Sequence, residues 1–237
     1  MELKEMIAKR KSVRKYTDEP VSAEMLETIM QFVKAARPLL PDIKVHAEIV
    51  TREQVRFIQP WKTPQLIAFY SEPKEGYLEN AGFILQQADL YLQSLGLGSC
   101  WLGLGKLRQE DPPEGMEFVI LLAFGHTEEQ LRSGAGEFKR KSLAEIADRE
   151  DETFEPVRIA PSSVNSQPWY FTHEGEKLHA FCAQKGLLKH AMLGYMNRID
   201  MGIALAHLYV CHPDRFCVTF EEGRELKDHR YTATVQI

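Results

Sequence analysis

The chain has 237 residues, of which 44% are hydrophobic and 27% are charged, with 15 glycines and 12 prolines. This composition is that of a globular protein and excludes collagen-like and low-complexity chains. The net charge of −5 argues against nucleic acid as the main partner. A chain of this length predicts one or two domains with a full hydrophobic core.

The sequence carries no sign of export or of membrane insertion. Its four cysteines form no C-x-x-C pair, and the cationic segment at the start of the sequence precedes no apolar signal-peptide run. The longest apolar stretch, residues 118–124, is far shorter than a membrane span. We therefore expect a cytoplasmic protein in a reducing compartment.

Hydrophobic periodicity and turn residues predict the elements of the first half. In chain order they are a basic helix over 3–15, a helix from an N-cap at Ser22 to about Ala36, strands over 45–50 and 66–70, a buried helix over 79–95 with Gly96 as its C-cap, a buried strand over 118–124 and a surface loop over 125–141.

The second half predicts a similar series. Its elements are a short helix over 142–147, a hairpin of strands 169–172 and 177–182 with its turn at 173–176, a buried helix over 198–210, and a second hairpin of strands 216–220 and 231–237.

A weak internal repeat links the two buried helices. Residues 80–85 read Asn-Ala-Gly-Phe-Ile-Leu, and residues 200–205 read Asp-Met-Gly-Ile-Ala-Leu. Six positions also fit a chance likeness between two buried helices, since both must be rich in small and apolar residues. The repeat and the coincidence both stay open at this point.

The first segment with chemical potential is the basic run Arg10-Lys11-Ser12-Val13-Arg14. Arg10 and Arg14 lie four residues apart, so a helix would place them on one face. Two guanidiniums with a hydroxyl nearby can hold a phosphate through charge-assisted hydrogen bonds. Spacing alone favours a solvated basic helix face, because other lysines lie nearby.

The second segment is the polar loop between Ala160 and Trp169. It offers three serine hydroxyls and two side-chain amides but no strong acid or base. Such groups both donate and accept hydrogen bonds, so they suit the edge of a planar heterocycle better than proton transfer. A capping and turn segment is the alternative interpretation.

Two further segments are glycine-rich or cationic. The run Gly96–Gly105 is not a dinucleotide fingerprint, because Trp101 stands at the third glycine position and the run follows a helix. It offers backbone amides beside an aromatic ring, or alternatively a helix C-cap and a turn. The run 138–142 brings three cations, Lys139, Arg140 and Lys141, which together with the arginines of the first segment could close a phosphate site.

Other chemistries lack their motifs. The sequence has no G-x-S-x-G elbow, no Walker loop and no H-E-x-x-H. His207, Cys211 and His212 lie close in sequence, but the spacing supplies no clear third metal ligand. We expect a packing histidine and an inert cysteine there.

Taken together, these segments resemble the FMN-dependent nitroreductase family, which includes flavin reductases. Residues 10–16 resemble its N-terminal arginine motif, and residues 161–169, Pro-Ser-Ser-Val-Asn-Ser-Gln-Pro-Trp, are the most specific match. Residues 96–103 and 139–142 resemble its later flavin-contacting segments. The resemblance implies an α+β fold in which helices pack on mostly antiparallel sheets.

The order of the motifs departs from that family. In ordinary members the proline-serine loop soon follows the arginine motif, whereas here that place reads Ala36–Asp42 without the loop. The second half has the loop but reads Ala147-Asp148-Arg149-Glu150-Asp151 where an arginine motif would stand. Since ordinary members are homodimers with flavins at the interface, we expect a fused pseudo-dimer with halves 1–141 and 142–237.

The resemblance implies one FMN per chain, because the second site lacks two or three phosphate contacts, a loss of about 3–9 kcal/mol. It also implies transient NADH or NADPH, a nitroaromatic, quinone or flavin acceptor, and chemistry that belongs to the flavin rather than to a protein acid or base. The implied flavin-binding residues are Arg10, Lys11, Ser12, Arg14, Cys100, Trp101, Leu102, Gly103, Lys139, Arg140, Lys141, Pro161, Ser162, Ser163 and Asn165.

Two other functions stay open. A fused chain with one degenerate site could be a flavin carrier or sensor without turnover. A basic-surface interaction protein using residues 4–15 fits poorly with the negative net charge. Because fusion removes the need to dimerise, we expect a monomer, with a homodimer as the alternative.

Overall fold

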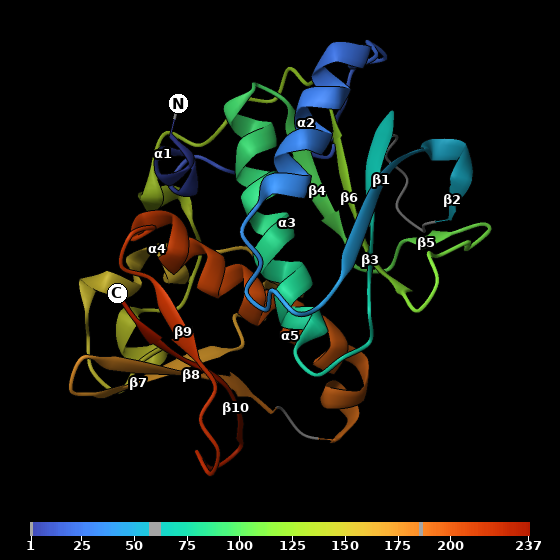
Figure 1. Ribbon diagram of the computed structural model, residues 1–237. Coiled ribbons are helices and arrows are strands. Elements are labelled where there is room, and N and C mark those ends of the chain that lie inside the picture. Colours follow the sequence, from blue (N-terminus) through green and yellow to red (C-terminus); the bar gives the residue numbers. More distant parts are fainter. Residues whose placement is uncertain (1, 57–62, 185–186) are drawn as a thin grey trace.

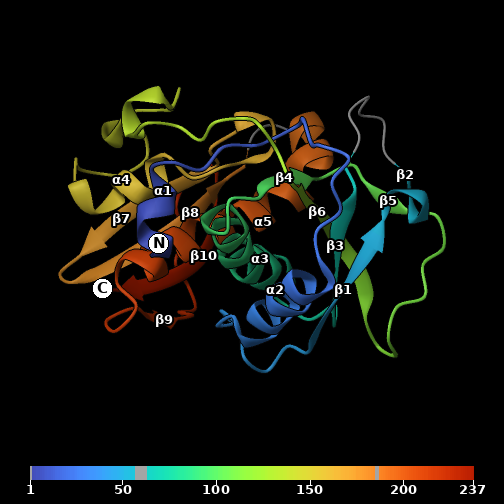
Figure 2. The same cartoon turned by 90° about the horizontal axis from the view of Figure 1, so that it is seen from above.

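The computed structural model describes residues 2–56, 63–184 and 187–237. Two long helices, α3 (Tyr77–Ser94) and α5 (Leu187–Cys211), run through its centre with one four-stranded sheet on either side (Figure 1, Figure 2). Most side chains of α3 are buried, which explains why its sequence is apolar on most faces.

The remaining elements fall into two series. Before and after α3 come α1 (Leu3–Ile7), α2 (Ala23–Ala35), β1 (Val45–Thr51), β2 (Val55–Arg56), β3 (Gln65–Ser71), β4 (Gly98–Leu102), β5 (Lys106–Leu107) and β6 (Glu117–Gly125). Around α5 lie α4 (Glu155–Arg158), β7 (Trp169–Glu174), β8 (Lys177–Ala183), β9 (Cys217–Thr219) and β10 (His229–Gln236).

The two large sheets have the same strand order. The first sheet runs β1-β3-β6-β4 and the second β7-β8-β10-β9, and every pair of neighbours is antiparallel. In each sheet the two strands before the long helix pair with each other, and the last strand lies between them and the strand directly after the helix. The α+β prediction with antiparallel sheets is confirmed. No helix within the described residues is both long and apolar enough to cross a membrane.

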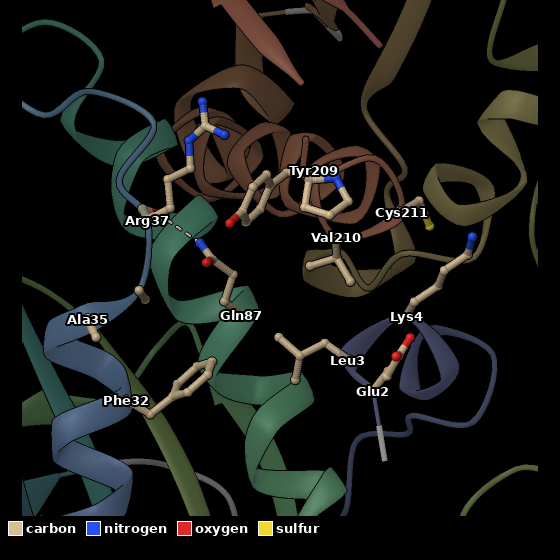
Figure 3. Close-up of a pocket in the computed structure, with 12 residues that line it drawn as sticks. Glu2, Leu3, Lys4, Phe32, Ala35, Arg37, Gln87, Tyr209, Val210 and Cys211 are labelled. Atoms are coloured by element: carbon tan, nitrogen blue, oxygen red, sulfur yellow. Dashed lines mark hydrogen bonds between the residues drawn. The ribbon is translucent and has the colours of Figure 1, made fainter. Parts of the chain in front are cut away.

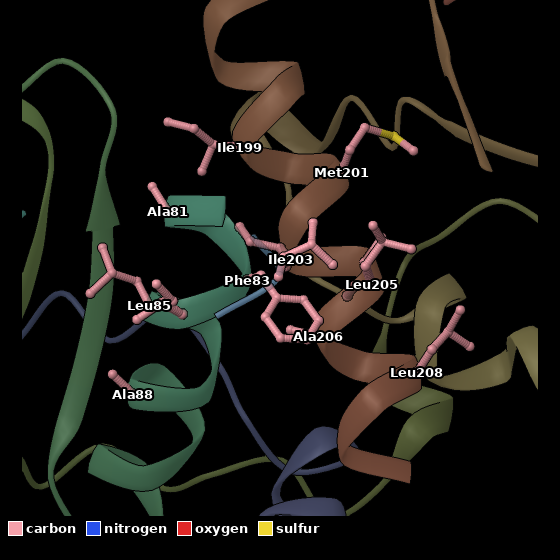
Figure 4. Close-up of a cluster of buried hydrophobic side chains, with 14 of the residues drawn as sticks. Ala81, Phe83, Leu85, Ala88, Ile199, Met201, Ile203, Leu205, Ala206 and Leu208 are labelled. Carbon is pink, nitrogen blue, oxygen red and sulfur yellow. The ribbon is translucent and has the colours of Figure 1, made fainter. Parts of the chain in front are cut away.

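The two central helices pack closely against each other at Gly82 and Gly202. Figure 4 shows side chains next to these glycines, among them Ala81, Phe83 and Met201. A Cβ atom at Gly82 would lie 2.0 Å from the carbonyl oxygen of Ile199, and one at Gly202 would lie 1.9 Å from that of Glu79. Each glycine therefore meets the backbone three residues before the other. The reciprocal contact involves the same two glycines that align in the repeat of residues 80–85 and 200–205.

Buried polar side chains on α3 hold segments that are distant in sequence. The Asn80 side-chain oxygen accepts hydrogen bonds from the backbone amides of Leu39 and Leu40, at 2.9 and 3.0 Å. The Gln93 amide bonds both the backbone N–H and the carbonyl of Lys11, at 3.0 and 2.9 Å. The central helix thus fixes the N-terminal segment, which lines the cavity described below, and also the loop after α2, which does not.

The sequence-based helix over residues 3–15 is wrong beyond Ile7, because α1 ends there and residues 10–16 are extended. Ser12 forms an isolated parallel bridge with Ser99, and the Val13 amide donates to the Ser99 carbonyl at 2.9 Å. The strand β4 was missed because Gly98 within it and the glycines on either side, Gly96 and Gly103, suggested a turn. The hairpin β7–β8 is confirmed, but its turn is only Gly175-Glu176.

Candidate active site

A cavity of about 350 Å³ lies where the N-terminal segment, β4, the loop after α4 and α5 meet. Ser12 and Arg14 line it from the N-terminal segment, Cys100 and Trp101 from β4, and residues 161–164 from the loop. Ile199, Asp200 and Ile203 line it from α5. The cavity size and mainly apolar lining with a few polar groups are typical of a small-molecule site.

The N-terminal segment reaches the cavity because its neighbours hold it against β4. Val13 is fully buried, and a Cβ at Gly98 would lie 2.5 Å from the Val13 side chain, so the segment packs closely on the strand. On the solvent side, Glu129 accepts hydrogen bonds from the backbone amides of Arg14 and Lys15, at 3.2 and 3.0 Å. Arg14 itself is exposed at the cavity edge.

Arg10 lies behind the cavity wall rather than in it. It is 1% exposed, and its Nε lies 2.9 Å from a carboxylate oxygen of Asp89, at an angle unsuited to a hydrogen bond. Ser99 donates to the other Asp89 oxygen. Breaking such a buried ion pair from one side would be strongly destabilising, since it leaves a buried charge without its partner.

The loop 161–167 holds an unusual backbone. Val164, Asn165 and Gln167 all have positive φ, at 47°, 56° and 44°, a region that non-glycine residues seldom adopt. Within the loop, the Ser162 hydroxyl accepts a hydrogen bond from the Gln167 amide at 2.9 Å. Strained backbone of this kind is concentrated at binding and catalytic sites, where the surroundings fix it.

Asp200 holds the same loop from α5. One carboxyl oxygen accepts a hydrogen bond from the Ser163 amide at 3.0 Å, and the other lies 3.4 Å from the Ser166 hydroxyl. Asp200 is only 3% exposed and forms no ion pair with any described residue. Burial raises the pKa of this carboxyl to about 8, and its two hydrogen bonds only partly oppose that shift.

The β4 wall has an unpaired donor and an inert thiol. The indole Nε1 of Trp101 is buried and makes no hydrogen bond. Burial raises the pKa of the Cys100 thiol, so this cysteine stays protonated and is a poor nucleophile. After the strand, Gly103 lets the backbone come close to Met196, whose sulfur would lie 2.9 Å from a Cβ there.

Three arginines gather beside the loop. Arg132 and Arg140 lie over the Phe138 ring, with guanidinium carbons 4.2 and 5.5 Å from its centre, and Arg132 donates to the Arg10 carbonyl. Burial, followed by repulsion from Arg10 and Arg132, lowers the pKa of Arg140 to about 10. Within the described chain, neither Arg132 nor Arg140 forms an ion pair with a carboxylate. Such a partly buried cluster of like charges would be stabilised by an anion.

Comparison with known proteins agrees with this geometry. A family profile described as "Putative TM nitroreductase" matches residues 2–212. The chain belongs to this nitroreductase family. No curated protein matches the chain.

Solved nitroreductase structures are similar to this chain at low sequence identity. A "putative nitroreductase" of Thermotoga maritima is 19% identical, with 100% of this chain and 94% of that one covered and a TM-score of 0.68. A nitroreductase family protein of Clostridium difficile 630 is 19% identical over 61% of this chain and 96% of its own, with a TM-score of 0.48. A "putative nitroreductase in complex with FMN" from Desulfovibrio desulfuricans is 20% identical over 60% of this chain and 93% of its own, with a TM-score of 0.44.

The structure of this nitroreductase family member brings together many of the residues that the sequence analysis selected. Those that line the cavity are Ser12, Arg14, Cys100, Trp101, Gly103, Pro161, Ser162 and Ser163. Arg10 and Arg140 lie in the neighbouring arginine cluster.

Five other selected residues lie neither in the cavity lining nor in the arginine cluster. Lys11 pairs with Glu129 at 2.9 Å, and the Lys141 ammonium donates to the Gln167 carbonyl at 2.9 Å, so the latter supports the loop. The other three lie elsewhere. Leu102 is buried in an apolar cluster with Leu66 and Leu121, Lys139 is exposed, and the Asn165 side-chain amide donates to the Lys139 carbonyl at 3.3 Å.

Sequence reasoning missed Arg132 and the site role of Asp200. Arg132 lies in a polar loop, where nothing distinguishes one cation from the next. Asp200 did carry a signal, because it is a carboxylate in a helix that is otherwise mostly apolar. His207 is fully buried, its ring donates to the Pro156 carbonyl at 2.7 Å, and burial lowers the pKa of its imidazole to about 3.

A second, wider cavity of about 530 Å³ lies between α1, the end of α2 and the end of α5 (Figure 3). Arg37 and Tyr209 lie on one side of it, and the Gln87 amide donates to the Arg37 carbonyl at 2.9 Å. The Arg37 guanidinium lies over the Tyr209 ring, 5.0 Å from its centre, and donates to the Phe216 carbonyl. Arg37 is therefore already engaged by protein groups.

Proposed function

We propose that this nitroreductase family member is an FMN-dependent oxidoreductase that uses NADH or NADPH to reduce nitroaromatics, quinones or flavins. The observation that supports it best is the cavity itself. Arg14, from the start of the chain, and Ser163, from beyond its midpoint, line one cavity beside three clustered arginines. Family membership favours the same activity.

The residues present fit an FMN molecule. A phosphate would be held by Arg132 and Arg140, because neither forms an ion pair with a carboxylate of the described residues, whereas Arg10 behind them is paired with Asp89. The unpaired Trp101 indole N–H and the serine hydroxyls of the loop are donors suited to the edge of a planar ring. Gly103 also lines the cavity, with the Met196 side chain packed against it.

FMN, when bound, supplies the two-electron redox chemistry. The protein binds and orients it, and the cavity's apolar side chains, such as Ile199 and Ile203, exclude water from its ring. Arg14 at the cavity edge stabilises negative charge; at about 4 Å and an effective dielectric constant of about 20, such an interaction is worth up to about 4 kcal/mol. One open cavity can receive the nicotinamide and then the acceptor in turn, which favours a ping-pong mechanism.

We further propose that residues 1–141 and 142–237 are two halves of an intramolecular pseudo-dimer with one FMN, active as a monomer in the cytoplasm. The matching sheet orders and the reciprocal glycine contact support this. On the opposite side of the helix crossing, Leu39, Phe83 and Phe216 are buried in the core, so they occupy the space that a second flavin ring would need.

The visible absorbance of the purified protein tests the proposal. We expect yellow protein with one FMN per chain, and loss of the flavin absorbance when NADH or NADPH is added without oxygen. Colourless protein that takes up no added FMN would contradict the proposal. Bound FMN that fails to bleach would instead favour a flavin carrier or sensor, and two FMN per chain would contradict the single-site prediction.

A further inference from the structure

Asp200 has a counterpart on the other central helix, and comparing the two side chains shows whether holding the loop requires an ionisable group. Asn80 occupies the matching place on α3 and accepts hydrogen bonds from Leu39 and Leu40, as Asp200 does from Ser163. An amide oxygen is therefore sufficient to hold such a loop. The ionisable group at position 200 is not required for that hydrogen bond.

The two side chains differ in whether they face a cavity that a ligand could enter. Asp200 lines the cavity, whereas Asn80 is fully buried beside the filled counterpart. Within the described residues no cation pairs with Asp200, and its only hydrogen-bond partners are the Ser163 amide and the Ser166 hydroxyl.

Titratable and charged groups approach Asp200 from three sides. The Cys182 thiol faces it from β8, and burial followed by the Asp200 charge raises the pKa of that thiol to about 12, so it stays neutral. Arg14 and the protonated Cys100 thiol line the same cavity. None of them neutralises a carboxylate by direct contact, so a proton is the group that does so at neutral pH.

A proton on Asp200 would have only a distant acceptor within the protein, the Ser166 hydroxyl. The Ser166 hydroxyl donates to the side-chain oxygen of Asn197 at 3.0 Å, which leaves its own oxygen free to accept. The Asp200 oxygen lies 3.4 Å from it, a long contact at the limit of a hydrogen bond. The carboxyl O–H is thus weakly used within the protein and available to an acceptor in the cavity.

We propose that Asp200 is a ligand-binding residue that presents a neutral carboxyl O–H to an acceptor atom, a ring carbonyl or ring nitrogen, of the heterocycle in the cavity. This inference rests on the proposed function in taking FMN as that heterocycle. Ionisation of Asp200 removes the donor and places a negative charge beside an electron-rich ring. Ligand affinity should therefore fall as the carboxyl loses its proton.

The test measures FMN dissociation constants at about pH 7 and about pH 9, a range in which the FMN phosphate is already ionised. For the unmodified protein we expect affinity about tenfold weaker at the higher pH. Asp200→Asn keeps an acceptor for Ser163 and has no proton to lose, so its affinity should be independent of pH. Asn80→Asp is the matched control: it adds an acid at the counterpart position and should leave the tenfold pH effect on FMN binding unchanged.

Infrared difference spectra of the FMN-free protein give a second readout. A protonated carboxyl band present at neutral pH, lost as the pH rises through about 8 and absent from Asp200→Asn would support the proposal. An ionised Asp200 at neutral pH, or an unchanged pH effect on FMN affinity in Asp200→Asn, would overturn it. If the unmodified protein binds no FMN at either pH, the proposed function fails, and the infrared titration still decides the protonation state.

Discussion

The loop after α4 and the loop after α2 occupy matching positions but differ in what they face. Each follows a short or medium helix, contains a proline, and is held by a polar side chain from a central helix, Asp200 or Asn80. The loop after α4 presents serines to a cavity, whereas the loop after α2 presents Leu39 to the core. Loops in matching positions therefore border one cavity and one packed region, and the size and polarity of their side chains distinguish the two.

The largest expected effect compares Phe83 with Ile203, which occupy matching places in the repeat. Phe83 is fully buried and contacts the Phe216 ring, with ring centres 5.7 Å apart. Phe83→Ala should lower the free energy of unfolding by about 3–5 kcal/mol, because it leaves a void in a filled core. Ile203→Ala should cost only about 2 kcal/mol, because the side chain already faces a cavity. Urea unfolding measures both, and equal losses would show that the two regions are packed alike.

The second effect concerns the crossing that both halves share. Gly82→Ala should reduce the free energy of unfolding by about 3 kcal/mol, because the added methyl would meet a backbone carbonyl that cannot move alone. Gly202→Ala should cost a similar amount. Gly136→Ala is the control, since no atom lies within 4 Å of a Cβ there, and it should change stability little. If Gly82→Ala changed the free energy of unfolding only slightly, the two helices would not be packed closely at this point.

The third effect tests which arginine contributes to FMN binding. Arg140→Ala should weaken FMN binding by about 10- to 150-fold, the loss of one charged contact of about 1.5–3 kcal/mol. Arg37→Ala, on the counterpart side, should leave FMN affinity unchanged, although it removes a guanidinium that lies over Tyr209. Fluorescence quenching of FMN reports both affinities. If only Arg37→Ala weakened FMN binding, the flavin would lie on the Arg37 side of the central helices, contrary to the proposal.

The smallest effect is a pH dependence in the support of the N-terminal segment. The hydrogen bond and charge of Lys11 lower the pKa of Glu129, so this carboxylate stabilises the fold above the pKa of the unfolded state and loses that contribution as the pH falls. Glu129→Gln should cost about 0.5–1 kcal/mol at neutral pH. The cost should shrink below about pH 4. Glu128→Gln, at the adjacent exposed residue, should show no such pH dependence in urea unfolding.

The sequence predicted elements whose signals are local. Ser22 caps α2 as expected, with its hydroxyl accepting from the Met25 amide, and the hairpin β7–β8 and α3 lie close to where the sequence pattern placed them. The second central helix was predicted too short, because α5 begins at Leu187 rather than at residue 198. The polar loop after α4 was identified from its dense hydroxyls and amides, which few structural turns need.

What the sequence could not show depends on distant contacts. The segment around Arg10 and Arg14 has a helical pattern, but Gln93 and Ser99 bind its backbone in an extended form. β4 is a strand because β6 pairs with it, despite its glycines. Arg132 approaches Arg10 only after the chain has folded, so no spacing rule could select it.

Both walls of the cavity belong to a single polypeptide, since Arg14 and Ser163 are joined by the chain that folds between them. A pocket shared by separate subunits falls apart on dilution, whereas a pocket within one chain, as the proposed pseudo-dimer has it, would persist at any protein concentration. Joining has a genetic result as well. In a symmetric pair of identical chains every substitution occurs twice, but in the proposed pseudo-dimer Leu39 and Ser162 are separate codons, so one pocket could be retained while its counterpart became filled.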